Sequence, residues 1–223
     1  MSNLTLGYWK IRGLAEPIRL LLHYLGIEYK EVLYEFGPAP DFSGDSWFKV
    51  KYTLGFDYPN IPYLLDGEFK MTESNAILRY ICEKYKPELL GETIKEKALV
   101  NMAVGVLGDL NFAKSQLAYK GKDCPGNERF KTTIKNKLND LNTLLGKQKF
   151  LAGDKMTYPD FVLDEIIESI NDLIEPIFEE YKNLKKHFDT ICELPAIKKY
   201  RNEREALPYN AAMAKIGGVV EKK

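Results

Sequence analysis

The sequence has few of the residues that build metal sites and disulfide frameworks. Its 223 residues include two histidines and only three cysteines, Cys82, Cys124 and Cys192, which lie far apart. Zinc sites usually need closely spaced Cys or His ligands, and a disulfide framework needs an even number of cysteines. We therefore predict no metal site. The scattered, odd cysteines favour a reduced protein of the cytoplasm.

Long apolar runs and an excess of one charge are also missing. No run reaches the length of about 20 residues that a membrane helix requires. Lys10 and Arg12 interrupt the first apolar stretch, so we predict no signal peptide. Lysine and arginine total 32, as do aspartate and glutamate, whereas a general nucleic-acid surface needs a basic excess. These absences leave a small-molecule partner, with no nucleic acid and no membrane.

Familiar catalytic motifs are absent as well. The sequence has no glycine pattern for a phosphate loop or a dinucleotide site. His23 lies in an apolar helical run and is expected to pack there, which leaves little support for a Ser-His or Cys-His pair. We therefore expect tyrosines and backbone groups to carry the chemistry.

Hydrophobic spacing divides the chain into two units. Residues 1–85 alternate strands and helices around a Pro/Gly/Asp-rich loop at 36–47, and residues 92–223 are helical after a linker at 86–91. In the second unit, Thr157 and Asp160 have the spacing of a capping box. The elements expected in the first unit are a strand at 4–9, a helix at 14–25, a strand at 29–35, a hairpin at 61–71 and a helix at 72–85.

Three short stretches suggest a binding edge. Tyr8 ends the first strand, Ile61-Pro62 enters the hairpin, and Glu73-Ser74 opens the following helix. Each has an ordinary interpretation: a packed tyrosine, an edge-strand proline and a helix cap. Together they fit a short peptide: the Ile61 backbone pairs with its centre, and the helix start with Glu73 holds a free amino-acid end.

Longer motifs resemble one family. LGYWKIRGLAEPIRLLL, the GPAPD loop, LGFDYPNIPYLLDG and MTESNAILRYI, with GDKMTYPDF in the helical half, closely resemble cytosolic glutathione S-transferases of the mu class. The resemblance implies an α/β plus all-α fold, in which a thioredoxin-like domain precedes a helical bundle and the chain forms a homodimer. It implies reduced glutathione as co-substrate and no cofactor.

The resemblance also implies residue roles. Tyr8 would donate its hydroxyl to the glutathione sulfur, and Tyr119 would assist some electrophiles. The glutathione site would comprise Tyr8, Trp9, Leu14, Trp47, Lys51, Asn60, Ile61, a cis Pro62, Glu73, Ser74 and, from across the dimer interface, Asp109. Leu14, Phe36, Phe112 and Tyr119 would line the electrophile pocket, and Tyr58 and Arg79 would lie at the dimer interface.

The chemistry is consistent with these roles. A thiol with a pKa of about 8.5 is only slightly ionised near neutral pH, and the thiolate is the nucleophile. Lowering that pKa by about two units takes roughly 2.7 kcal/mol of thiolate stabilisation. A protonated tyrosine hydroxyl and the field of a helix start are suitable donors.

Some positions depart from the mu pattern, and two functions stay open. Gly44 replaces an arginine, Glu73 a glutamine, and Asn111 a histidine found in some relatives. We expect conjugation of glutathione to hydrophobic electrophiles in detoxification, since Tyr8 and Tyr119 are retained. The alternative is a non-catalytic ligand carrier or structural protein on the same fold. The physiological electrophile, peroxidase or isomerase side activities, and the position of the tail from Arg204 stay open.

Overall fold

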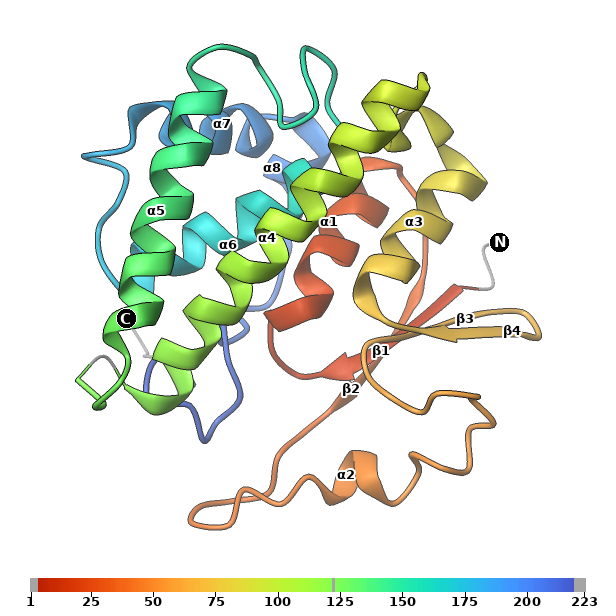
Figure 1. Ribbon diagram of the computed structural model, residues 1–223. Coiled ribbons are helices and arrows are strands. Elements are labelled where there is room, and N and C mark those ends of the chain that lie inside the picture. The colour runs from red at the N-terminus through yellow and green to blue at the C-terminus, as the bar shows by residue number, and fades with distance from the viewer. Residues whose placement is uncertain (1–3, 122, 219–223) are drawn as a thin grey trace.

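A four-stranded sheet forms the amino-terminal half of the computed structural model, which describes residues 4–121 and 123–218 (Figure 1). The strand order is β2-β1-β3-β4, with β1 parallel to β2 and antiparallel to β3. The Ile61–Pro62 bond is cis, and β3 begins only after it because proline has no N–H to donate to a ladder. The strands are β1 (Leu4–Trp9), β2 (Lys30–Tyr34), β3 (Tyr63–Asp66) and β4 (Phe69–Thr72).

Helices α1 (Glu16–Tyr24) and α3 (Ser74–Tyr85) lie between the sheet and the helices of the second half (Figure 1). A short 3-10 helix, η1 (Gly13–Ala15), leads into α1. The predicted loop at 36–47 runs into one further helix, α2 (Asp45–Phe48), which is too short to show a helical period in the sequence. The strand–helix order predicted for this half is otherwise confirmed.

The second half is helical, as expected. Its apolar core joins the inner faces of α4, α5, α6 and α7, while α8 packs on α1. One turn of 3-10 helix, η2 (Pro87–Leu90), occupies the stretch expected to be a linker. None of the helices within 4–121 and 123–218 is long and apolar enough to cross a membrane. The helices are α4 (Ile94–Lys120), α5 (Glu128–Leu145), α6 (Tyr158–Leu173), α7 (Lys182–Cys192) and α8 (Pro195–Glu203).

The start of α6 is fixed by one buried carboxylate. Asp160 accepts hydrogen bonds from the backbone N–H of Thr157 at 2.8 Å and of Leu151 at 3.0 Å. It also contacts Nε2 of His187 at 2.9 Å. The capping box predicted at Thr157 is confirmed, and its acid also ties α6 to the preceding loop and to α7.

A second capping box, at the start of α4, gives a first testable result. The hydroxyl of Thr93 accepts from the N–H of Glu96 at 3.1 Å, and the Glu96 carboxylate accepts from the N–H of Thr93 at 2.8 Å. Thr93→Ala should cost about 1 kcal/mol of unfolding free energy, measured in urea. Thr132→Ala, which removes a hydroxyl inside α5, is the control. An equal loss in both variants would contradict a capping role.

Candidate active site

The hydroxyl of Tyr8 is held by the backbone of the turn that follows β1. The N–H of Leu14 donates to Tyr8 Oη at 3.1 Å, and the Tyr8 side chain is only 6% exposed. Burial raises the pKa of Tyr8 to about 12, although the Leu14 hydrogen bond acts in the opposite direction. The hydroxyl therefore stays protonated, and no acceptor for its proton lies within hydrogen-bond distance among the described residues.

Gly13 allows this close approach. Its φ is +43°, which disfavours a side chain, and a Cβ at this position would lie 2.7 Å from Tyr8 Oη. The chain can therefore fold back over the phenol and begin η1 with the N–H of Leu14 aimed at it. A helix start places partial positive charge beside the same hydroxyl.

An open cleft of about 320 Å³ lies over Tyr8. Four residues predicted to act together line it: Tyr8, Leu14, Phe112 and Tyr119. Phe36 instead stacks on Trp9, with ring centroids 4.1 Å apart, and is not among the residues that line this cleft. The remaining lining residues are Ile11, Gly13, Gly108, Asn111, Lys114, Ser115, Tyr209 and Asn210.

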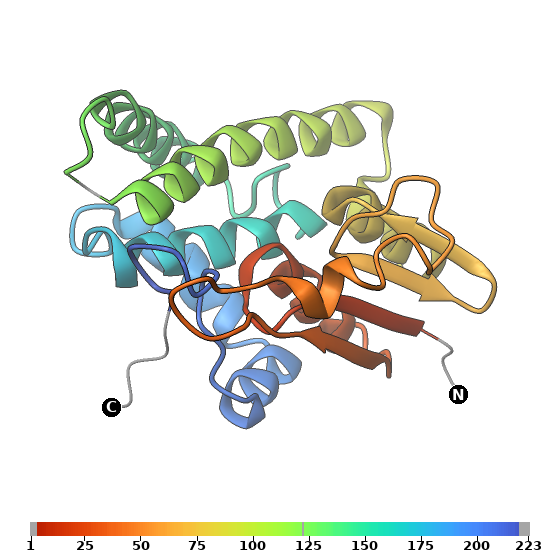
Figure 2. The same ribbon diagram turned by 90° about the horizontal axis from the view of Figure 1, so that it is seen from below.

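The tail after α8 closes one side of the cleft. The N–H of Arg12 donates to the carbonyl of Pro208 at 2.8 Å, and the N–H of Ala211 donates to Tyr119 Oη at 3.2 Å. The N–H of Ile216 donates to the carbonyl of Ala118 at 3.1 Å. In Figure 2 the blue tail lies beside the turn that follows β1. The described part of the tail, up to residue 218, therefore packs along the cleft, which resolves the alternative left open by the sequence for these residues; residues 219–223 lie outside the described residues.

A second, smaller hollow adjoins the cleft at the start of α3. Leu14, Gly108 and Asn111 line both, and Ser74 lines only this one. The residue before Ser74, Glu73, has a φ of +70°, unusual for a side-chain-bearing residue, and such strain is concentrated at functional sites. Glu73 Oε1 accepts from Asn60 Nδ2 at 3.2 Å.

The backbone of Ile61 is partly engaged. Its N–H donates to Oδ1 of Asn60 at 2.9 Å, so a bound peptide that paired with this N–H would have to displace the Asn60 side chain. Ile61 precedes the cis bond to Pro62, as the family resemblance implies.

Two predicted residues of the 36–51 region, Phe36 and Trp47, stack on rings at the ends of β1 and β3. Trp47 is buried on α2, stacked on Tyr63 with centroids 6.1 Å apart. Lys51 follows α2, and its ammonium lies 5.4 Å from the ring of Tyr52. A Cβ at Gly44 would lie 2.5 Å from the ring of Phe48, so an arginine there requires that ring to move.

Three predicted residues lie on the outer surface and do not line the cleft over Tyr8. Tyr58 is 81% exposed, and Arg79 donates to Oδ1 of Asn101 at 2.6 Å. Asp109 is exposed on α4 and pairs with Lys137 at 3.2 Å. Their proposed roles depend on a second subunit.

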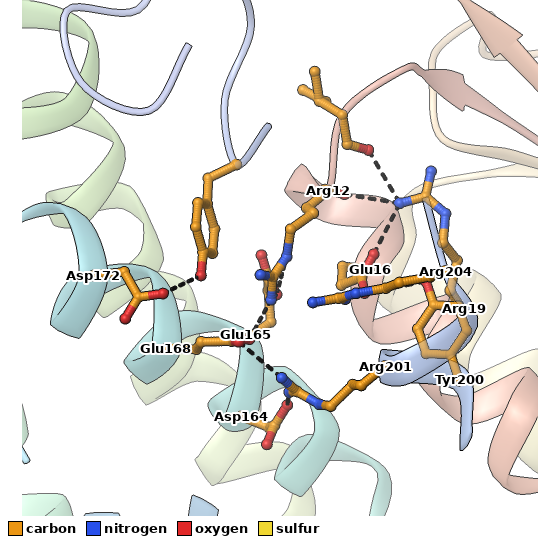
Figure 3. Close-up of polar contacts among 12 residues, drawn as sticks. Arg12, Glu16, Arg19, Asp164, Glu165, Glu168, Asp172, Tyr200, Arg201 and Arg204 are labelled. Atoms are coloured by element: carbon orange, nitrogen blue, oxygen red, sulfur yellow. Dashed lines mark hydrogen bonds and ion pairs between the residues drawn. The ribbon is translucent and has the colours of Figure 1, made fainter. Parts of the chain in front are cut away.

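A buried charge network anchors the Tyr8 turn to the helical half. The Arg12 guanidinium pairs with Glu165 and Glu168 of α6, and Arg201 of α8 pairs with Glu168 at 2.8 Å and with Asp164 (Figure 3). The carboxylates hold the pKa of Arg12 above its ordinary value despite burial. The network joins two halves of the chain across 153 residues of sequence.

The sequence interpretation missed Lys114, which lines the cleft. A signal existed, because Lys114 falls on the apolar stripe of α4 that includes Leu107, Leu110 and Leu117. A lysine is rarely buried on such a stripe without a reason. It also missed Arg12 and Glu165, whose pairing is not visible without the fold.

Comparison with known proteins identifies the family. The models for the glutathione S-transferase N-terminal and C-terminal domains match residues 4–83 and 109–204. A glutathione S-transferase of Dermatophagoides pteronyssinus is 35% identical over 96% of this chain and 97% of its own. Glutathione S-transferase Mu 2 of Macaca fuscata fuscata is 40% identical over 92% and 93%.

Comparison with solved structures supports the same family. The Pi-class glutathione S-transferase of Onchocerca volvulus superposes with a TM-score of 0.81 at 26% identity, covering 96% of this chain and all of that one. The glutathione S-transferase Blo t 8 superposes with a TM-score of 0.74 at 31% identity, covering 96% and 99%. With its sheet, its helical half and its tyrosine at the end of the first strand, this chain belongs to the glutathione S-transferase family.

Proposed function

We propose that the protein conjugates the thiolate of reduced glutathione to hydrophobic electrophiles, with Tyr8 as the thiolate-stabilising donor. The state of the Tyr8 hydroxyl carries the proposal. The N–H of Leu14 donates a hydrogen bond to the oxygen of the Tyr8 hydroxyl. Burial keeps the phenol protonated, and the hydroxyl proton has no acceptor among the described residues. A sulfur placed in the cleft would accept that proton in a hydrogen bond, which strengthens as negative charge develops.

We assign the peptide of glutathione to the edge between β3, α2 and the start of α3. The γ-glutamyl end would contact Glu73 and Ser74, the cysteinyl backbone would pair with Ile61, and the glycine carboxylate would lie near Trp47 and Lys51. The strained backbone of Glu73 and the unpaired N–H groups at the start of α3 support an orientation in which the γ-glutamyl end of the peptide lies there. Asn60, Trp9, Leu14 and Pro62 complete the set, and Asp109 would reach the partner subunit's glutathione.

We assign the electrophile to the cleft formed by Leu14, Phe112 and Tyr119, with Phe36 at its margin. In this proposal, residues 1–85 form the glutathione-binding domain and residues 92–223 form the helical domain that supplies most of the electrophile pocket. Residues 86–91 link the two domains. Detoxification in the cytoplasm is the role we propose. The described cysteines are free, as expected of a reducing compartment.

The test is turnover of glutathione with 1-chloro-2,4-dinitrobenzene, read by absorbance, beside glutathione binding by calorimetry. An enzyme should bind glutathione and accelerate conjugation well above the spontaneous rate. A protein that binds glutathione without accelerating the reaction would be the non-catalytic carrier instead.

We also propose a homodimer in which Tyr58 inserts into the neighbouring subunit. Tyr58 is 81% exposed, so its ring is free to contact a neighbouring subunit. Tyr58→Ala should shift the sedimentation profile toward monomer. Tyr52→Ala, at a tyrosine of similar exposure on the same connection, should stay dimeric. A Tyr58→Ala protein that sediments like the native one would refute the assignment.

A further inference from the structure

Lys114 is a buried cation in the wall of the cleft over Tyr8. It lies on α4, its residue is only 7% exposed, and it lines the cleft with Tyr8 and Tyr119. Among residues 4–121 and 123–218, no carboxylate lies within ion-pair distance of its ammonium and no acceptor takes its protons. Lys114 Nζ is not among the fully buried polar atoms that lack a partner, so the side chain packs along its length while the ammonium faces the open cleft.

The surroundings of Lys114 compensate its charge only in part. Burial lowers its pKa to about 8, the charge of Glu165 partly opposes this, and the charge of Arg12 adds to it. Glu165 is itself engaged by Arg12, whose Nε lies 3.1 Å from Glu165 Oε2. The other polar side chains lining the cleft are phenols, amides and a hydroxyl, none of them a carboxylate. The cleft therefore presents an ammonium that is mostly protonated at neutral pH, forms no direct ion pair with the described residues and is only partly compensated by Glu165.

We propose that Lys114 makes the cleft selective for electrophiles that carry a carboxylate, which would lie against its ammonium while the glutathione thiolate attacks the electrophilic carbon. This inference rests on the proposed transferase function and names its substrate class. In an aryl chloride, the thiolate sulfur bonds to the ring carbon and chloride leaves with the bonding electrons. Lys114 forms no covalent bond; it positions the substrate through a charge-assisted hydrogen bond.

The test compares 4-chloro-3,5-dinitrobenzoate with its methyl ester. These aryl chlorides differ by one negative charge, and each kcat/KM is divided by the spontaneous rate constant with glutathione. The normalised ratio of acid to ester should exceed one in the native protein. Lys114→Met, which keeps the length but not the charge, should lower that ratio about tenfold, chiefly through KM for the acid. Lys114→Arg should retain most of it.

The native protein provides an independent measurement. Thiolate formation affects both substrates and cancels in the ratio, and Tyr8, whose pKa is raised to about 12, stays protonated over this range. Glu165, whose pKa burial raises to about 7, completes most of its ionisation at the lower end of the range. The ratio should fall between pH 7 and pH 9 as Lys114 loses its proton, since its pKa is about 8. Because this profile needs no variant, it tests the inference even if Lys114→Met fails to fold.

The outcomes separate the two claims. An unchanged ratio in folded Lys114→Met, or a ratio that stays flat from pH 7 to pH 9, overturns the role of Lys114 while ester turnover upholds the transferase. Failure of the native protein to conjugate either compound or 1-chloro-2,4-dinitrobenzene overturns the transferase itself, and the inference with it.

Discussion

Replacing Tyr8 with phenylalanine should lower kcat/KM for 1-chloro-2,4-dinitrobenzene about 100-fold at pH 6.5. A loss of that size corresponds to about two pKa units of the bound thiol, or roughly 2.7 kcal/mol. The difference should shrink as the pH rises toward about 9, because a thiol with an ordinary pKa of about 8.5 then ionises without help. The measurement is the pH profile of kcat/KM for both proteins.

The pH at which this profile inflects identifies the group that titrates. The pKa of Tyr8 is raised to about 12, so the phenol does not ionise between pH 6 and pH 9, and the inflection belongs to the glutathione thiol. Tyr63→Phe is the matched control, since it removes another buried hydroxyl, 3.0 Å from that of Tyr34 and outside the cleft. If Tyr8→Phe and Tyr63→Phe give the same profile as the native protein, another group activates the sulfur.

The second large effect is on stability. Arg12→Met should lower the free energy of unfolding by about 3–5 kcal/mol, because it leaves the buried Glu165 carboxylate without its cation and Glu168 with Arg201 alone. The variant also loses the stacking of the guanidinium over the ring of Tyr209, whose centroid is 4.1 Å away. Urea unfolding measures the loss.

Two further variants decide whether burial explains the result. Lys49→Met breaks an exposed pair with Asp45, where the distance is 3.0 Å, and should cost less than about 1 kcal/mol. Arg12→Met combined with Glu165→Gln should recover part of the stability, since one unpaired charge is removed. Equal costs for Arg12→Met and Lys49→Met would show that the network contributes no more than a surface pair.

The sequence alone determined the order of strands and helices. Period-two and period-3.6 spacing are local properties, so the strand at Leu4–Trp9 and the helix at Ser74–Tyr85 could be predicted within a few residues. The helices that the sequence did not predict, α2 and η2, have only four residues each, too few to show a helical period. The motifs around Tyr8, Pro62 and Ser74 were enough to indicate the family.

Tertiary structure decided what surrounds the reacting group. The contact between Leu14 and Tyr8 depends on Gly13 folding the chain back, and the tail reaches the cleft only because α8 returns beside α1. Burial and charge compensation are sums over residues far apart in sequence, so neither the pairing of Arg12 with Glu165 nor the unpaired ammonium of Lys114 can be deduced from spacing. The sequence thus determined which groups are present, while packing determined which of them are buried, paired or left free to bind.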